Sequence, residues 1–116
     1  MKPFQLAEYK DPKSGKTPTD DLADALRDFL DDGLPLIKLA AFRRYLAAEG
    51  QLYGRCLERI QPGNIQVWVY SQGRFHIIYS YYRARNEVCL LKFVNGDAKN
   101  ELDDAKERVR RFYSGR

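Results

Sequence analysis

Hydrophobic positions along the 116-residue chain change their spacing twice. Between residues 18 and 49 they recur every three or four positions, which is typical of amphipathic helices, and between 65 and 94 they alternate with polar positions, which is typical of strands. Helical spacing returns from residue 98 to residue 112. A short, weakly alternating segment at residues 4–9 predicts one further strand. The resulting order β-α-α-β-β-β-α predicts an α+β fold.

Capping and breaking residues set the expected boundaries of the two N-terminal helices. Thr17 is a candidate N-cap and Pro18 suits the first helical position, so helix one is expected over 18–32. Gly33 and Pro35 end it, and a second helix is expected over 36–49. Residues 51–64 lack a steady period and are predicted to form a loop that leads to the sheet.

Three predicted strands, at 65–70, 75–82 and 88–94, are separated by turns at 71–73 and 83–86. Short turns join antiparallel neighbours, so these strands predict a meander, which the N-terminal strand completes as a four-stranded antiparallel sheet. The C-terminal helix is expected to pack on this sheet. We expect Leu102, Val109 and Phe112 to be buried against Val67, Ile77 and Leu91, with Arg108 and Arg111 exposed.

Alternation also predicts which strand residues share a face. The face expected to meet the helices carries Ile65, Val67, Val69, Phe75, Ile77 and Tyr79. The opposite face is expected to carry Gln66, Trp68, Tyr70, Arg74, His76, Tyr82 and Lys92. Aromatic rings stack on unpaired bases and cations hold phosphates, so this second face is a candidate RNA surface. The alternative is that its aromatic residues and its histidine serve packing.

Length and composition favour one globular domain over residues 1–116, with 44% hydrophobic and 31% charged residues. No apolar run is long enough to span a membrane, and no apolar segment follows Lys2, so we expect a cytoplasmic protein without a secretory signal. Cys56 and Cys89 are too few and too far apart to suggest a zinc site or a disulfide framework.

The net charge of +4 is unevenly distributed. Residues 1–50 carry 8 basic and 9 acidic side chains, whereas residues 51–116 carry 12 basic and 7 acidic ones. A clustered positive field favours an anionic partner such as nucleic acid, the ribosome or an acidic protein, although ordinary solubility charge is an equal alternative.

Several other chemistries find little support in the chain. The glycines are dispersed and form no phosphate-binding loop, so no nucleotide cofactor is expected. The acidic residues between 20 and 32 fit helix capping better than a metal site, and no metal is expected. Cys89 lies in an apolar strand and is expected to be a small buried residue rather than a nucleophile.

Local phrases along residues 4–113 resemble the RelE/ParE superfamily of toxins of type II toxin-antitoxin systems, within it the phage-derived RelE-like and HigB-like branch. The matching phrases are Tyr9-Lys10-Asp11 with Gly15 and Thr17-Pro18, Glu49-Gly50, Gly54-Arg55, Val67-Trp68-Val69-Tyr70-Ser71, Phe75-His76-Ile77-Ile78-Tyr79, Leu90-Leu91-Lys92-Phe93, and Lys99 before a helix from Glu101 to Arg111. The chain differs from the family where Ser71 and His76 occupy positions that are usually arginine, and where Lys99 stands for a double lysine.

The resemblance implies a RelE-like fold and, as activity, ribosome-dependent cleavage of mRNA without a metal or cofactor. The expected catalytic residues are His76 or Tyr82 as acid, Arg74 as phosphate clamp, and Lys92 or Lys99 as base or electrostatic partner. The expected RNA-binding residues are Trp68, Tyr70, Arg83, Arg85 and Lys99. The implied partners are a cognate antitoxin, mRNA and the ribosome. One alternative is a non-catalytic protein of the same fold that inhibits a protein target such as DNA gyrase. Another is a nucleic-acid-binding module without toxicity.

Overall fold

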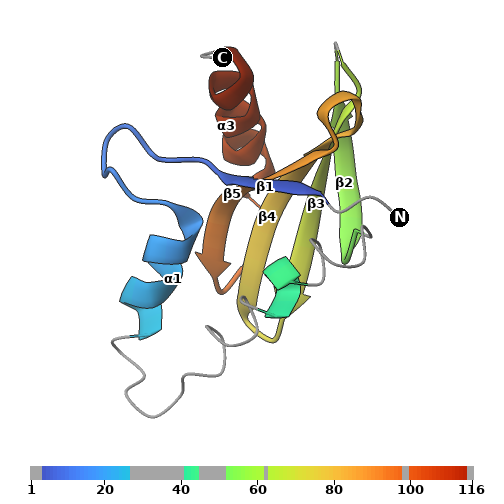
Figure 1. Cartoon of the computed structure of the whole chain (residues 1–116). Helices are drawn as coiled ribbons and strands as arrows, with labels where there is room; N and C mark the ends of the chain where they lie inside the picture. Colours follow the sequence, from blue (N-terminus) through green and yellow to red (C-terminus); the bar gives the residue numbers. More distant parts are fainter. Residues whose placement is uncertain (1–3, 27–40, 45–51, 62, 98–99, 115–116) are drawn as a thin grey trace.

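Figure 1 shows the protein as a computed structural model, which describes residues 4–26, 41–44, 52–61, 63–97 and 100–114. Its elements are β1 (Gln5–Glu8), α1 (Pro18–Leu26), β2 (Arg55–Ile60), β3 (Ile65–Gln72), β4 (Phe75–Tyr82), the 3₁₀ turn η1 (Arg83–Arg85), β5 (Glu87–Asn95) and α3 (Leu102–Ser114). The α+β class is confirmed, with one strand more than the sequence predicted.

The sheet has five strands in the order β1-β5-β4-β3-β2. Strands β2 to β5 are antiparallel, as the predicted meander requires, but β1 runs parallel to β5, with Leu6 opposite Val88. The expectation of a four-stranded, wholly antiparallel sheet is therefore wrong. Parallel pairing needs a long connection, which the intervening chain supplies, and alternation within a strand says nothing about its direction.

Strand β2 lies where a loop was predicted, and that prediction is wrong. The pairing of β2 with β3 shifts by one residue between Cys56 and Glu58, so Leu57 is the extra residue of a β-bulge. A bulge breaks the alternation of buried and exposed side chains, which is why the strand is not visible as a period of two. Gln61, Gly63 and Asn64 belong to the following turn, where Asn64 has φ of 52°.

The turn between β3 and β4 determines which side chains share a face. Gln72 pairs with Phe75, so only Gly73 and Arg74 form the turn, and Gly73 has φ of 60°, as expected at the first position of a type II′ hairpin turn. Across a two-residue turn, odd-numbered residues of β3 lie opposite even-numbered residues of β4. The predicted faces, which joined odd positions with odd positions, are therefore wrong.

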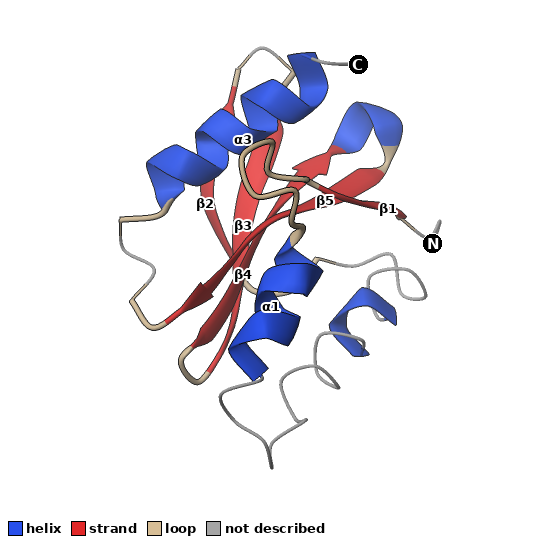
Figure 2. Ribbon diagram, turned by 90° about the vertical axis from the view of Figure 1, so that its left-hand side faces the viewer, coloured by secondary structure: helices blue, strands red, loops and turns tan. Residues whose placement is uncertain are grey.

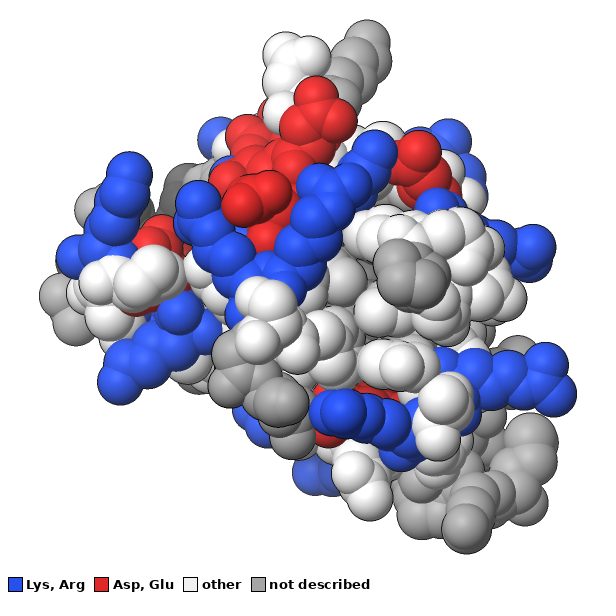
Figure 3. All heavy atoms as spheres, turned by 90° about the horizontal axis from the view of Figure 1, so that it is seen from above, with Lys and Arg blue, Asp and Glu red and all other residues white. Residues whose placement is uncertain are grey.

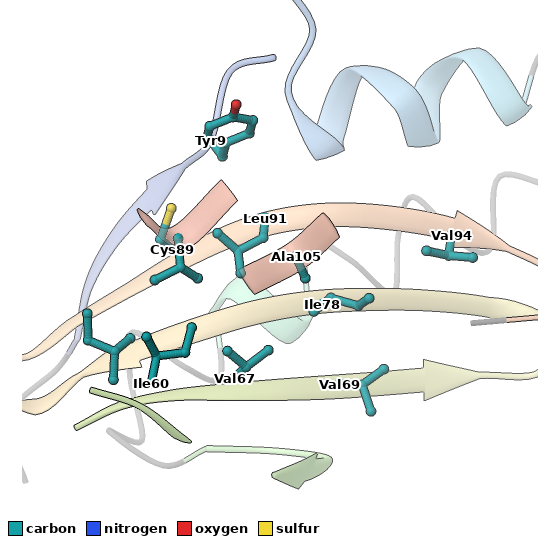
Figure 4. Packing of buried hydrophobic residues seen from close by; sticks show 11 residues of the cluster. Tyr9, Ile60, Val67, Val69, Ile78, Cys89, Leu91, Val94 and Ala105 are labelled. Atoms are coloured by element: carbon teal, nitrogen blue, oxygen red, sulfur yellow. The ribbon is translucent and has the colours of Figure 1, made fainter. Parts of the chain in front are cut away.

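The sheet buries side chains on both faces, with α3 on one side and α1 on the other (Figure 2). On the α3 face, Val67, Val69, Ile78 and Leu91 pack with Ala105 in one apolar cluster (Figure 4). The second cluster, on the α1 face, joins Leu22 and Phe42 to Ile77, Tyr79, Val88 and Leu90. A helix on each face explains why both sets of strand residues are largely apolar.

The predicted start of α1 is confirmed by its capping contacts. Thr17 Oγ1 accepts a hydrogen bond from the Asp20 backbone N–H at 3.2 Å, and Asp20 Oδ2 accepts one from the Thr17 N–H at 3.0 Å. Residues 27–32 of the predicted first helix lie outside the described residues. So does most of the predicted second helix, of which residues 41–44 are described and are helical.

Helix α3 packs on the sheet mainly through Ala105 and Val109, which are fully buried. Leu102 and Phe112 lie half-buried at the margin of this cluster, whereas Ile77 belongs to the opposite face. Arg111 is exposed as predicted, but the prediction for Arg108 is wrong. Its side chain is only 12% exposed, because it is held by Asp11, Asp104 and the Leu91 carbonyl. None of the described helices is long and apolar enough to cross a membrane.

Candidate functional site

A pocket of about 240 Å³ opens on the α3 face, near the end of the sheet where β3 turns into β4. Four elements line it: β2, β3, β4 and the segment that follows β5. The lining residues are Arg55, Leu57, Val69, Ser71, His76, Ile78, Gly96 and Asp97. The pocket therefore has apolar side chains at its base and polar groups around them.

His76 is held at this pocket by hydrogen bonds at both ring nitrogens. Its Nε2 lies 2.7 Å from the Gly96 carbonyl oxygen, and its Nδ1 lies 2.7 Å from Ser71 Oγ. A carbonyl only accepts, so Nε2 carries the proton in the neutral ring and Nδ1 accepts from the Ser71 hydroxyl. The arrangement is a hydroxyl, a base and a group that orients the base, which is the geometry that activates a hydroxyl.

Ser71 and His76 meet because they are a cross-strand pair of β3 and β4. Ser71 is exposed and His76 is half-buried, so the hydroxyl is the more accessible of the two groups. The sequence placed Ser71 in a predicted turn at 71–73, which is wrong because β3 continues to Gln72, and otherwise indicated it only as a departure from arginine. Recognising Gly73-Arg74 as a two-residue turn would have placed Ser71 opposite His76.

Arg74 lies at the same end of the sheet but does not line the pocket. Its Nε donates to Asn95 Oδ1 at 2.6 Å, and its carbonyl accepts from the Gly96 N–H at 2.7 Å. These bonds connect the β3–β4 turn to the end of β5. The arginine in the lining of the pocket is instead Arg55, which the sequence did not identify as a site residue because the bulge in β2 obscures the period of that strand.

Lys92 does not join His76 in the pocket. Its Nζ lies 2.5 Å from Glu101 Oε2 and 2.6 Å from Asp104 Oδ2, both at the start of α3. Burial of Lys92 opposes its charge, but the hydrogen bonds to Asp104 and Glu101 raise the pKa above its ordinary value. Lys92 is thus a permanently charged member of an ion-pair network, which does not fit a general base.

Trp68 and Tyr70 lie on the α1 face, opposite the pocket. Trp68 Nε1 donates to Gln66 Oε1 at 2.8 Å, and the Tyr70 ring stacks on Phe42 with centroids 4.5 Å apart. The prediction that these rings share a face with His76 is wrong, because the two-residue turn reverses the parity between β3 and β4. The contacts of Trp68 and Tyr70 indicate that these two residues serve packing on the α1 face.

Tyr82, Arg83 and Arg85 lie at the other end of β4. Tyr82 lies six positions after His76, which in a strand is about 20 Å. The Arg85 guanidinium lies 5.6 Å from the centre of the Tyr82 ring and 5.7 Å from that of Tyr113. These residues do not converge with His76. Lys99 lies outside the described residues.

On the face that Figure 3 shows, the described basic side chains do not form one continuous surface. Figure 3, which views the molecule from above, shows lysine and arginine side chains around this face with a group of acidic side chains beside them. Ion pairs account for part of the basic charge: Lys106 pairs with Glu58 at 2.8 Å, and Glu107 lies within reach of Arg110 and Arg111. The net charge of the C-terminal half is therefore a poor guide to an RNA surface.

No group of three or more His, Cys, Asp or Glu side chains within the described residues could hold a metal ion. In comparisons with known proteins, no family model, curated protein or solved structure matches the chain.

Proposed function

We propose that the protein is the toxin of a type II toxin-antitoxin system and cleaves mRNA at the pocket beside His76. The observation that carries the proposal is the Ser71–His76 hydrogen bond at the rim of a pocket that Arg55 also lines. The proposal includes a ribosome-bound mRNA as substrate, a cognate antitoxin as silencing partner, and the cytoplasm as the place of action.

The groups at the pocket match the needs of metal-independent RNA cleavage. The ribose 2′-hydroxyl loses its proton through Ser71 Oγ to His76 Nδ1, and the 2′-oxygen forms a bond to the adjacent phosphorus. The bond between phosphorus and the 5′-oxygen breaks, which leaves a 2′,3′-cyclic phosphate. The 5′-oxygen takes a proton from the imidazolium, which returns His76 to its neutral state.

Two substitutions of His76 test this role. His76→Gln retains an amide N–H that can donate to the Gly96 carbonyl but cannot exchange a proton, and His76→Ala removes both functions. Both variants should lose about 10²- to 10⁴-fold in cleavage, the usual contribution of a general acid-base group. Arg59→Ala, an exposed arginine of β2 that does not line the pocket, is the control and should retain activity.

The measurement combines growth arrest on expression, primer extension on cellular transcripts and the unfolding midpoint of each purified variant. Loss of cleavage in His76→Gln with an unchanged midpoint supports proton transfer by His76. Full cleavage by either His76 variant contradicts it. No cleavage by the wild-type protein contradicts the endoribonuclease proposal as a whole.

One observation favours the second candidate, a non-catalytic protein that inhibits a protein target such as DNA gyrase. Both nitrogens of His76 are already hydrogen bonded within the protein, and Lys92 is paired with two carboxylates. These are features that a purely structural role also explains. This candidate predicts growth arrest without cleaved transcripts, and inhibition of DNA supercoiling by the purified protein.

A further inference from the structure

The base of the pocket is apolar and belongs to the main core. Val69 and Ile78 are directly paired across β3 and β4, and they are 8% and 1% exposed. Figure 4 shows both side chains in the cluster on the α3 face. Leu57 of β2 completes this base. A phosphate group is strongly hydrated and gains nothing from such a surface, whereas the flat face of a nucleobase does.

The pocket is small, at about 240 Å³. A drug-sized ligand occupies a larger site, of roughly 300–1,000 Å³. The pocket thus suits one base of a strand whose sugar and phosphate remain outside, near Ser71 and His76.

Two charged residues line the pocket from opposite sides. Arg55 is the first residue of β2, and Asp97 follows the end of β5. Strands β3 and β4 lie between β2 and β5. A base above Val69 and Ile78 therefore lies between a guanidinium group and a carboxylate group.

Of the four RNA bases, guanine alone presents two adjacent acceptors and, next to them, two adjacent donors. A guanidinium group binds its O6 and N7 in a bidentate manner. A carboxylate accepts from its N1–H and N2–H₂, because an ionised carboxylate is a pure acceptor with two oxygens. Adenine, cytosine and uracil lack the adjacent pair of donors.

We infer that this pocket binds a guanine base, with Arg55 at its O6 and N7 and Asp97 at its N1–H and N2–H₂. The inference rests on the proposed function, since it assumes that an RNA strand lies at this pocket. It goes further by assigning the base that is recognised and the two residues that select it.

The test measures binding of GMP, AMP, CMP, UMP and inorganic phosphate to the full-length protein, from the shifts of the Gly96 and His76 amide signals in NMR titrations. GMP should bind about tenfold more tightly than the other nucleotides. Arg55→Ala and Asp97→Asn should each lower GMP affinity about tenfold. The matched controls are Arg59→Ala, an exposed arginine further along β2, and Asp103→Asn, an exposed acid in the first turn of α3.

A GMP preference that is lost in both pocket variants and retained in both controls supports the inference. Equal binding of all four nucleotides and of phosphate overturns it, because the pocket then recognises phosphate alone. Absence of any shift at Gly96 and His76 also overturns it. Primer extension separates the two proposals: cleavage without a guanine preference contradicts only this inference, whereas GMP binding without cleavage contradicts only the endoribonuclease activity.

Discussion

The hydroxyl of Tyr79 connects the middle of the sheet to the segment that precedes β2. Tyr79 is fully buried, its hydroxyl donates to the Tyr53 carbonyl, and it accepts from the Tyr53 N–H at 3.1 Å. Burial raises the pKa of Tyr79 well above its ordinary value. The phenol is therefore a neutral structural group that satisfies two backbone atoms.

Tyr79→Phe should lower the free energy of unfolding by about 1–3 kcal/mol, because it removes the two hydrogen bonds that the Tyr79 hydroxyl makes with the Tyr53 backbone. Urea unfolding measures the change. Tyr81→Phe is the matched control, since Tyr81 is half-buried two residues further along β4 and contacts Phe4 through its ring. Equal losses in the two variants would contradict this role of the Tyr79 hydroxyl.

At the pocket, the sequence pointed to His76 itself but not to the residues that contact it. His76 was selected because imidazole exchanges protons near neutral pH, and the structure places it at a pocket. Its neighbours could not be derived in the same way. Ser71 and Gly96 lie beside His76 because of the length of one turn and the pairing of β4 with β5. Alternation within a single strand predicts neither of these.

At the scale of elements, the residue directly before β2 occupies a position that only glycine can adopt without strain. Gly54 has φ of 104°, and a Cβ atom placed there would lie 2.0 Å from the Val69 carbonyl oxygen. The close approach lets β2 pair with β3 and brings Arg55 to the pocket. The position of Arg55 thus depends on the residue before it, Gly54, having no side chain.

Gly54→Ala should lower the free energy of unfolding by about 3 kcal/mol, because a strained φ costs about 1–3 kcal/mol and the Val69 backbone must also move. Gly73→Ala is the matched control: φ is 60° there, and a Cβ atom would have no neighbour within 4 Å. It should cost about 1 kcal/mol. Similar urea midpoints for the two variants would show that the Gly54 contact is not a constraint.

Elements whose hydrophobic residues recur at a constant spacing could be predicted from the sequence. Elements in which that spacing is interrupted could not. Strands β3, β4 and β5, the capped start of α1 and the helix α3 all follow from spacing and capping residues. Strand β2 did not, because the bulge at Leu57 removes its period. The parallel pairing of β1 could not be predicted either, because the sequence of a four-residue strand does not indicate the direction of its partner.

At the scale of the whole molecule, one charge network joins three distant segments. Asp104 of α3 contacts Lys92 of β5 at 2.6 Å and Arg108 at 3.2 Å, and Arg108 reaches Asp11, in the segment after β1, at 3.4 Å. The Arg108 guanidinium also lies 5.1 Å from the centre of the Tyr9 ring. The network therefore fixes α3 against both the sheet and the N-terminal segment.

This network should make the fold sensitive to acid. Burial tends to raise the pKa of Asp104, but Lys92 and Arg108 hold it below its ordinary value of 3.8. Its contribution is therefore present above about pH 4 and is lost as the pH falls through the lowered pKa. Wild-type stability should fall more steeply than that of Asp104→Asn over this range, by at most about 1 kcal/mol, because Asp104 is 44% exposed.

Urea unfolding at a series of pH values measures the effect, and Asp103→Asn is the matched control on the same helical turn. The control should follow the wild-type curve. Parallel curves for wild type and Asp104→Asn would show that the network does not contribute.

The pairing of β1 with β5 has a consequence for how the chain is made. Leu6 has Val88 as its partner, so the first strand to leave the ribosome waits for nearly the whole domain to be synthesised. At ~5–20 residues per second, that wait lasts roughly 4–16 s. The hairpins of β2 to β5 join neighbours in sequence and can close as they emerge, whereas β1 must wait for a contact distant along the chain. A nascent chain interrupted before β5 therefore has an unpaired first strand, and it also lacks Arg108, the residue that holds Asp11 in the segment after β1.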